Sequence, residues 1–140
     1  MWDGNIIYSD AGVTSFSNRS IAPFMSSLVS RIIGDTFFEP TVEWLACIDP
    51  STPLECALTW ARESNDWTCD YVYSQVFNGT DLLTSGYAKG AYPIVELQVS
   101  KAALRLGTWL NKLVAGDYKV DRQVVLQTNP SWVGGPSEGA

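Results

Sequence analysis

The sequence contains no histidine among its 140 residues. Histidine is the usual general base near neutral pH and the commonest zinc ligand. Ser-His-Asp catalysis, Cys-His catalysis and histidine-built metal sites are therefore excluded for these residues alone. The sequence also lacks a phosphate-binding glycine loop, a Gly-x-Ser-x-Gly nucleophile turn and a Cys-x-x-Cys pair. Chemistry of these kinds requires residues from outside this chain.

Positive charge is scarce as well. Nine Lys and Arg residues against fifteen Asp and Glu residues give a formal net charge of -6 and a sequence pI of about 4.4. Such a chain repels nucleic acids and anionic lipids at neutral pH, unless cations are placed locally or a metal is bound. No apolar run reaches the roughly 18 residues that a membrane helix needs, and no signal peptide opens the chain. We expect no membrane partner.

The residues that are present indicate one folded, secreted domain. The apolar content of 46% and the six Trp, six Tyr and five Phe residues supply ample core material. Asn18-Arg19-Ser20 and Asn78-Gly79-Thr80 are N-glycosylation sequons, and three cysteines are compatible with an extracellular protein. A body that looks secreted but has no signal peptide suggests a truncated chain.

Helical periodicity dominates the first half of the chain. A helix is expected over residues 21–33, capped by Ser20 and stopped by Gly34. A short helical turn after Pro40 is expected to bury Val42 and either Trp44 or Leu45.

A second helix is expected to start with Thr52 as its cap, Pro53 at its first position and Glu55 three residues after the cap. The pattern extends this helix toward Val72. Residues 78–90 are rich in Gly, Ser, Thr and Asp, which predicts a surface connection.

The strongest periodic pattern predicts a helix opened by Pro93 and closed near Gly116. Its apolar residues step by three or four and predict its buried face: Val95, Val99, Ala102, Leu106, Trp109 and Leu113. Charged residues interrupt the pattern too often for a membrane span, so a helical bundle or a larger helical core is favoured. Residues 117–140 are expected to form a peripheral, partly disordered tail.

Cys47 and Cys56 bracket a turn with two prolines and are candidates for a disulfide. Cys69 is then left over. An odd cysteine in a secreted chain indicates a free thiol, a partner chain or a partner in missing sequence, and a buried unpaired thiol is the alternative.

Other side chains could bind a metal ion, a phosphate or a nucleic-acid base, but each of them also has a purely structural interpretation. Acidic pairs at helical spacing, Glu39 with Glu43 and Asp66 with Asp70, can hold a divalent ion, but a solvated helix surface is favoured. Arg105 and Lys112 lie seven residues apart and can meet a phosphate, although stems that flank the core are more plausible. Core packing is likewise favoured over base stacking for the tryptophans Trp44, Trp60, Trp67 and Trp109.

Two segments carry a family resemblance. The first is Ala57-Leu58-Thr59-Trp60-Ala61 with Ser64-Asn65 and Cys69. The second runs from Pro93-Ile94-Val95-Glu96-Leu97-Gln98-Val99 through Lys101 and Arg105-Leu106 to Trp109-Leu110-Asn111. Together they resemble the carboxy-terminal part of the secreted zinc nucleases of the S1/P1 nuclease family, especially its fungal members, over roughly residues 2–114.

The resemblance implies an all-α fold related to that of the zinc-dependent phospholipases C, with residues 1–116 forming the C-terminal helical portion of the nuclease domain. It implies hydrolysis of phosphodiester bonds of single-stranded DNA and RNA, and of 3′-nucleotides, with a cluster of three zinc ions. The complete protein is expected to be a secreted monomer.

Trp2-Asp3 resembles the end of the family's His-x-x-Trp-Asp metal motif, which implies that Asp3 is a zinc ligand. The motif's histidine then falls two residues upstream of Met1, and the other ligands belong to a missing N-terminal half. The family's cysteine at the position of Cys69 pairs far upstream. Because one carboxylate cannot hold a zinc cluster, the isolated chain is expected to be inactive.

Two other functions remain open at this stage. One is a non-catalytic secreted helical module that binds a partner through exposed aromatic side chains. The other is a zinc-dependent hydrolase of the phospholipase C type, which acts on a lipid instead of a nucleic acid.

Overall fold

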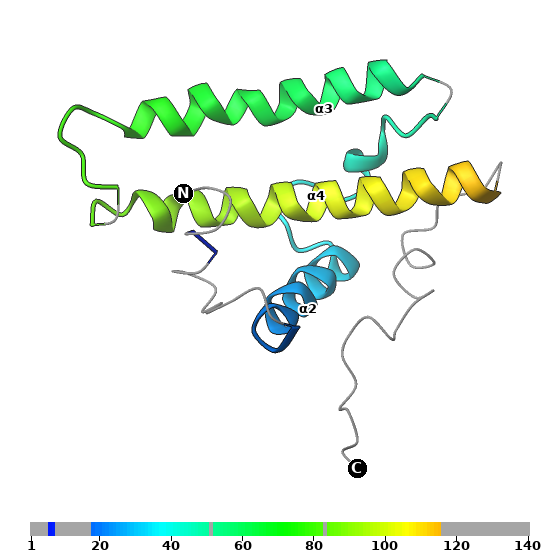
Figure 1. Cartoon of the computed structure of the whole chain (residues 1–140), viewed down its shortest axis with the longest axis horizontal. Helices are drawn as coiled ribbons and strands as arrows, with labels where there is room; N and C mark the ends of the chain where they lie inside the picture. The colour runs from blue at the N-terminus through cyan, green and yellow to red at the C-terminus, as the bar shows by residue number, and fades with distance from the viewer. Residues whose placement is uncertain (1–5, 8–17, 51, 83, 116–140) are drawn as a thin grey trace, which may run out of the picture.

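The computed structural model of the chain describes residues 6–7, 18–50, 52–82 and 84–115 (Figure 1). The regular structure of these residues is helical, as the all-α expectation requires. The elements in chain order are α2 (Asn18–Gly34), the 3-10 turn η1 (Glu43–Leu45), α3 (Pro53–Trp67), the π-helical turn η2 (Thr68–Tyr73) and α4 (Tyr87–Ala115).

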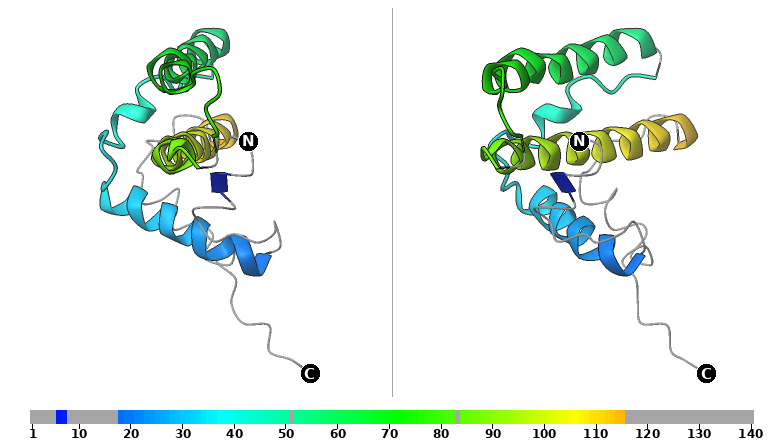
Figure 2. Two further views of the ribbon diagram at one scale, coloured as in Figure 1. Left: turned by 90° about the vertical axis from the view of Figure 1, so that its left-hand side faces the viewer. Right: turned by 60° about the vertical axis from the view of Figure 1, so that its left-hand side comes forward.

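The long helix α4 lies between the other two helices (Figure 2). Helix α3 runs along one side of α4, and α2 crosses its opposite side (Figure 1). Within the described ranges, no helix has both the length and the apolar character needed to span a membrane.

Helix α2 begins at Asn18, two residues before the expected cap. Ser20 is a helical residue, so the prediction that it caps the helix is wrong. No proline or glycine lies between Asn18 and Ile21, so nothing in this segment stops the helix from beginning upstream of Ser20. The expected end at Gly34 is correct.

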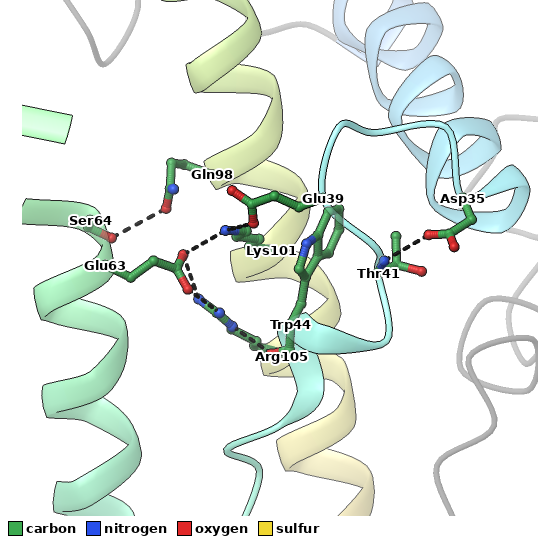
Figure 3. Close-up of polar contacts among 9 residues, drawn as sticks. All are labelled: Asp35, Glu39, Thr41, Trp44, Glu63, Ser64, Gln98, Lys101 and Arg105. Carbon is green, nitrogen blue, oxygen red and sulfur yellow. Dashed lines mark hydrogen bonds and ion pairs between the residues drawn. The ribbon is translucent and has the colours of Figure 1, made fainter. Parts of the chain in front are cut away.

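A left-handed residue closes α2, but it is Asp35 (φ 52°) and not the glycine before it. The Asp35 N–H donates to the Ile32 carbonyl at 3.3 Å, and the Thr36 N–H donates to the Arg31 carbonyl at 3.1 Å. These two bonds form a Schellman motif, which usually has glycine at the left-handed position. The Asp35 carboxylate accepts the Thr41 backbone N–H at 2.7 Å, which helps to offset the strain (Figure 3).

The buried face of α2 follows helical spacing through Phe24, Leu28 and Ile32. Met25 and Ile33 belong to the same apolar pattern but are exposed. The buried residues join a core in which the Phe37 ring meets the edge of Trp44 at 5.1 Å between centroids. Burial of each large side chain there contributes about 1.5–3 kcal/mol.

The short turn after Pro40 is present as η1, and it buries Trp44. The expectation that Val42 is buried is wrong, because its side chain is 71% exposed. Val42 is the residue before η1, whereas Trp44 within η1 belongs to the core and Leu45 packs partly against it.

Helix α3 starts at Pro53 with Thr52 at its N-cap position, as expected. The Thr52 side chain makes no capping hydrogen bond, because its backbone (φ -122°, ψ 57°) departs from the usual cap conformation. Beyond Trp67 the chain continues through the π-helical turn η2 to Tyr73, close to the expected end at Val72.

Helix α4 begins at Tyr87, so the prediction that Pro93 opens it is wrong. The Gly90 N–H donates to the Gly86 carbonyl at 3.1 Å, which closes the first helical turn. Tyr87 and Ala91 are buried, and this packing stabilises helix upstream of a proline that removes one hydrogen bond. The expected surface connection over residues 78–90 therefore ends at Gly86.

The buried face of α4 differs from the predicted stripe. Val95 is buried, but Leu106 and Leu113 are about three-fifths exposed, at 60% and 59%. The residues of α4 that are buried include four polar side chains: Ser100, Lys101, Arg105 and Thr108. A charged cluster between α4 and its neighbours is the reason for this difference.

Candidate functional site

Among the residues that the structure describes, those predicted to carry chemistry do not gather in one place. Asp3, the metal ligand implied by the resemblance, lies outside the described residues. Asn18 is the first residue of α2, and its side chain also lies outside the described part. Asn78 lies in an exposed turn between η2 and α4.

The three cysteines separate into a pair and a single thiol. Cys47 and Cys56 form a disulfide with their Cα atoms 5.3 Å apart, which ties the end of η1 to the first turn of α3. Cys69 in η2 is free and exposed. The alternative of a buried Cys69 thiol is thus wrong, and its pairing with an upstream cysteine stays a prediction.

The acidic pairs do not form a metal site. Among the described residues, no three His, Cys, Asp or Glu side chains come together in a group that can hold a metal ion. Glu39 instead forms an ion pair with Lys101 of α4. The residues that the structure describes therefore do not fit a zinc cluster by themselves.

The most developed polar arrangement is a partly buried ion-pair cluster between α3, α4 and the segment around η1 (Figure 3). We call it the Glu63 cluster, and it consists of Glu39, Glu63, Lys101, Arg105 and the Trp44 carbonyl. Glu63 of α3 accepts from the Lys101 ammonium at 3.0 Å. The Arg105 guanidinium donates to the same carboxylate through two nitrogens, at 2.6 and 3.3 Å. The Arg105 Nε–H donates to the Trp44 carbonyl at 2.9 Å, so one side chain joins α3, α4 and η1.

The cluster is held in a partly desolvated environment. The side chains of Lys101 and Arg105 are only 3% and 9% exposed, whereas that of Glu63 is 29% exposed. Burial raises the pKa of Glu63, but the hydrogen bonds and charges of Arg105 and Lys101 outweigh it and leave the pKa below its ordinary value. The carboxylate therefore stays ionised, and both cations are committed to a structural role.

The prediction that the Arg105 side chain only flanks the core is therefore wrong. Arg105 is buried, and its guanidinium also lies over the Trp60 ring, 5.4 Å from the centroid. Lys112 donates to the Ile48 carbonyl. Neither cation is presented to an incoming phosphate in this arrangement.

Sequence reasoning missed Glu63 and Lys101. The available signal was the spacing of Lys101 and Arg105, which lie four residues apart on an otherwise apolar helix. Two cations at that spacing share one face, and their burial requires an acidic partner. The partners lie 38 and 62 residues away in sequence, at Glu63 and Glu39, which no local pattern reveals.

A second feature is an apolar groove of about 570 Å³ between α3 and α4. Its walls combine two tryptophans, a leucine and an alanine with three polar side chains: Trp60, Ser64, Gln98, Ala102, Arg105, Leu106 and Trp109. The Trp60 and Trp109 rings meet edge to face at 5.7 Å between centroids. The Trp60 Nε1 and Gln98 Nε2 atoms are buried and have no hydrogen-bond partner.

The groove accounts for part of the apolar face that the sequence predicted to be buried on α4. Ala102, Leu106 and Trp109 lie on that stripe and line the groove. The tryptophans expected in the core are distributed accordingly: Trp44 is fully buried, and the other three are half-buried. Apolar walls of this kind are suited to packing against another apolar surface.

The chain belongs to the S1/P1 nuclease family, whose profile matches residues 1–115. It is similar to Nuclease S1 of Aspergillus oryzae, with 29% identity over 118 residues, or 82% of this chain and 40% of the relative. It is also similar to Nuclease P1 of Penicillium citrinum, with 26% identity over 92 residues, or 62% of this chain and 33% of the relative. The chain thus spans at most two fifths of these relatives' length, and no solved structure matches it significantly.

Proposed function

We propose that this chain is the C-terminal helical part of a zinc-dependent endonuclease. The complete enzyme hydrolyses phosphodiester bonds of single-stranded DNA and RNA, and also 3′-nucleotides. The observation that carries the proposal is the family match over residues 1–115. It is supported by relatives that are themselves nucleases.

The zinc ions of the complete enzyme require ligands from beyond this chain. The sequence has no histidine, and the described residues contain no metal-binding group. Asp3 is the one ligand that the resemblance assigns here, and it needs the histidine expected two residues upstream of Met1. We therefore propose that the 140-residue chain alone is inactive and that an N-terminal half supplies the remaining ligands.

The described residues contribute a scaffold to this enzyme. The Glu63 cluster fixes the positions of α3 and η1 on α4, and the disulfide fixes the connection between η1 and α3. The division of the chain near residue 116, with a peripheral tail after it, belongs to the same proposal.

The setting of the enzyme is proposed to be extracellular. A disulfide, two sequons and an exposed Cys69 available for an upstream cysteine support this assignment. The complete protein is proposed to be a monomer, and Asn18 and Asn78 are its candidate N-glycosylation sites.

A second candidate function is favoured by the groove between α3 and α4. Its open apolar walls fit a non-catalytic module that binds a protein partner. This module and the nuclease make opposite predictions for activity and for the reading frame upstream of Met1.

The test begins with the transcript upstream of the Met1 codon. We expect the frame to continue and to place a histidine two residues before Met1. The protein encoded by the extended frame should hydrolyse single-stranded DNA, and the activity should disappear with a chelator and return with zinc. The 140-residue chain should show neither activity nor stoichiometric zinc.

Asp3→Asn in the extended protein provides the residue-level check. It should reduce bound zinc and activity together, because an amide is a weaker ligand than a carboxylate. Asp66→Asn, which changes an exposed carboxylate of α3, is the matched control and should leave both unchanged. A stop codon directly upstream of Met1, or full activity of Asp3→Asn, contradicts the proposal and favours the binding module.

A further inference from the structure

The turn that contains the second sequon has a defined backbone. The Thr80 N–H donates to the Phe77 carbonyl at 3.0 Å, which closes a four-residue turn. The Phe77 N–H in turn donates to the Thr80 hydroxyl at 3.1 Å. Gly79 takes a φ of 85°, a conformation that suits glycine at the third position of such a turn. Two hydrogen bonds therefore hold Phe77, Asn78 and Thr80 together.

The same turn exposes an unusual amount of aromatic surface. Phe77 is 71% exposed, and Tyr73, four residues earlier, is 72% exposed. Asn78 is also exposed. A Cβ atom placed on Gly79 would have no heavy atom within 4 Å, so the space on that side of the turn is open. An exposed apolar ring next to an exposed asparagine indicates that another group covers this surface.

An N-linked sugar has the chemistry to cover it. N-acetylglucosamine is bulky and soluble, yet one side of its pyranose ring presents only C–H groups. Such a face packs on an aromatic ring, whose face carries negative charge. Phe77 directly precedes Asn78, so the first sugar on Asn78 has an aromatic surface within reach.

The first sequon offers no comparable arrangement. The backbone of Asn18, Arg19 and Ser20 is helical at the start of α2. A helical backbone does not form the four-residue turn that brings the Thr80 hydroxyl to the Phe77 N–H at the second sequon. The turn at Asn78 is thus the sequon whose folded geometry suits a glycan.

We propose that Asn78 carries an N-linked glycan whose first N-acetylglucosamine packs on the ring of Phe77. The proposal rests on the extracellular setting given under the proposed function. In the transfer step, the Asn78 amide nitrogen bonds to the anomeric carbon of a lipid-pyrophosphate-linked oligosaccharide. The bond from that carbon to the pyrophosphate oxygen breaks, the amide nitrogen loses one proton, and the lipid pyrophosphate leaves.

The first experiment measures occupancy. The full 140-residue chain is secreted from yeast behind a heterologous leader, and its peptides are treated with peptide N-glycosidase in water enriched in oxygen-18. Asn78 should be recovered as labelled aspartate. Asn78→Gln should remove this glycan from the protein, and Asn18→Gln should keep the labelled Asn78 peptide. Recovery of unmodified Asn78 from the secreted chain overturns the proposal.

The second experiment tests the packing on Phe77. Carbon-13-labelled glycans are trimmed with endoglycosidase H to one N-acetylglucosamine, whose proton shifts are measured by NMR. Ring protons of this sugar should shift upfield in the wild-type chain and return to free values in Phe77→Leu. The matched variant Tyr73→Leu should retain the upfield shift. An occupied site without the shift, or a shift that survives in Phe77→Leu, overturns the role of Phe77.

These readouts do not depend on catalysis. A yeast-secreted chain reports on the acceptor turn whether or not the extended protein is a nuclease. An inactive extended protein with a glycosylated Asn78 contradicts only the proposed function, and an active one with an unmodified Asn78 contradicts only the glycan.

Discussion

Glu63→Gln is expected to lower the free energy of unfolding by about 2 kcal/mol. The substitution keeps the shape of the side chain but removes the charge that faces two buried cations, Lys101 and Arg105. Breaking a fully buried ion pair from one side costs about 3–5 kcal/mol. The expected loss is smaller because Glu63 is 29% exposed and Lys101 keeps its ion pair with Glu39.

Urea unfolding followed by tryptophan fluorescence measures this loss. Glu55→Gln is the matched control, because Glu55 is an exposed glutamate on the same helix. It should change the unfolding free energy by no more than about 0.5 kcal/mol. Equal effects of the two substitutions contradict a stabilising Glu63 cluster.

The same carboxylate makes stability depend on pH. Because the pKa of Glu63 is lower in the folded chain, its contribution is fully present above its ordinary pKa of 4.5. It is lost as the pH falls through the lowered value. The difference in stability between wild type and Glu63→Gln should therefore narrow on acidification below pH 4.5.

Gly90→Ala is expected to destabilise the chain by about 2 kcal/mol, although alanine is a better helix former than glycine by about 1 kcal/mol. A Cβ atom at residue 90 lies 2.2 Å from the Tyr71 hydroxyl oxygen. That hydroxyl cannot move freely, because it donates to the Tyr87 carbonyl at 2.7 Å. The added methyl group must therefore displace Tyr71 or separate η2 from α4.

A double-mutant cycle isolates the contact. Tyr71→Phe removes the clashing oxygen and leaves the ring carbon that carries it 3.1 Å from the Cβ position. Gly90→Ala should therefore cost at least about 1 kcal/mol less in the Tyr71→Phe background than in the wild type. Equal costs in the two backgrounds mean that the close approach of Tyr71 is not the cause. The pKa of Tyr71, which burial and the nearby Tyr87 phenol raise, provides a spectroscopic check that Tyr71 has moved.

The contacts of α4 explain which parts of the fold the sequence predicts. Its existence follows from apolar spacing, since helical periodicity is a local property. The correct buried face does not, because Lys101 and Arg105 are buried by acidic residues far away in the sequence. Apolar periodicity instead selects Leu106 and Trp109, which line the groove. Pro93 misplaces the helix start for a similar reason, because the packing of Tyr87 and Ala91 extends the helix upstream.

The candidate site was predictable only in part. The family resemblance follows from residues 57–69 and 93–111, and the family profile confirms it. The pairing of Cys47 with Cys56 was inferable because the two lie nine residues apart across a turn. The turn at Asn78 was visible only as a sequon, since the exposure of Phe77 and the hydroxyl contact of Thr80 depend on the folded backbone.

The Glu63 cluster also sets an order of events during synthesis. Both of its cations lie on α4, whereas its acceptors at Glu39, Trp44 and Glu63 leave the ribosome earlier. Helices α2 and α3 can form from local contacts, but the carboxylates of Glu39 and Glu63 stay hydrated until residues 101–105 have been made. A nascent chain halted before residue 101 can therefore contain α2 and α3 but lacks the ion pairs and the Arg105–Trp44 hydrogen bond that join α3 and the segment around η1 to α4. Proteases should cleave such a chain around η1.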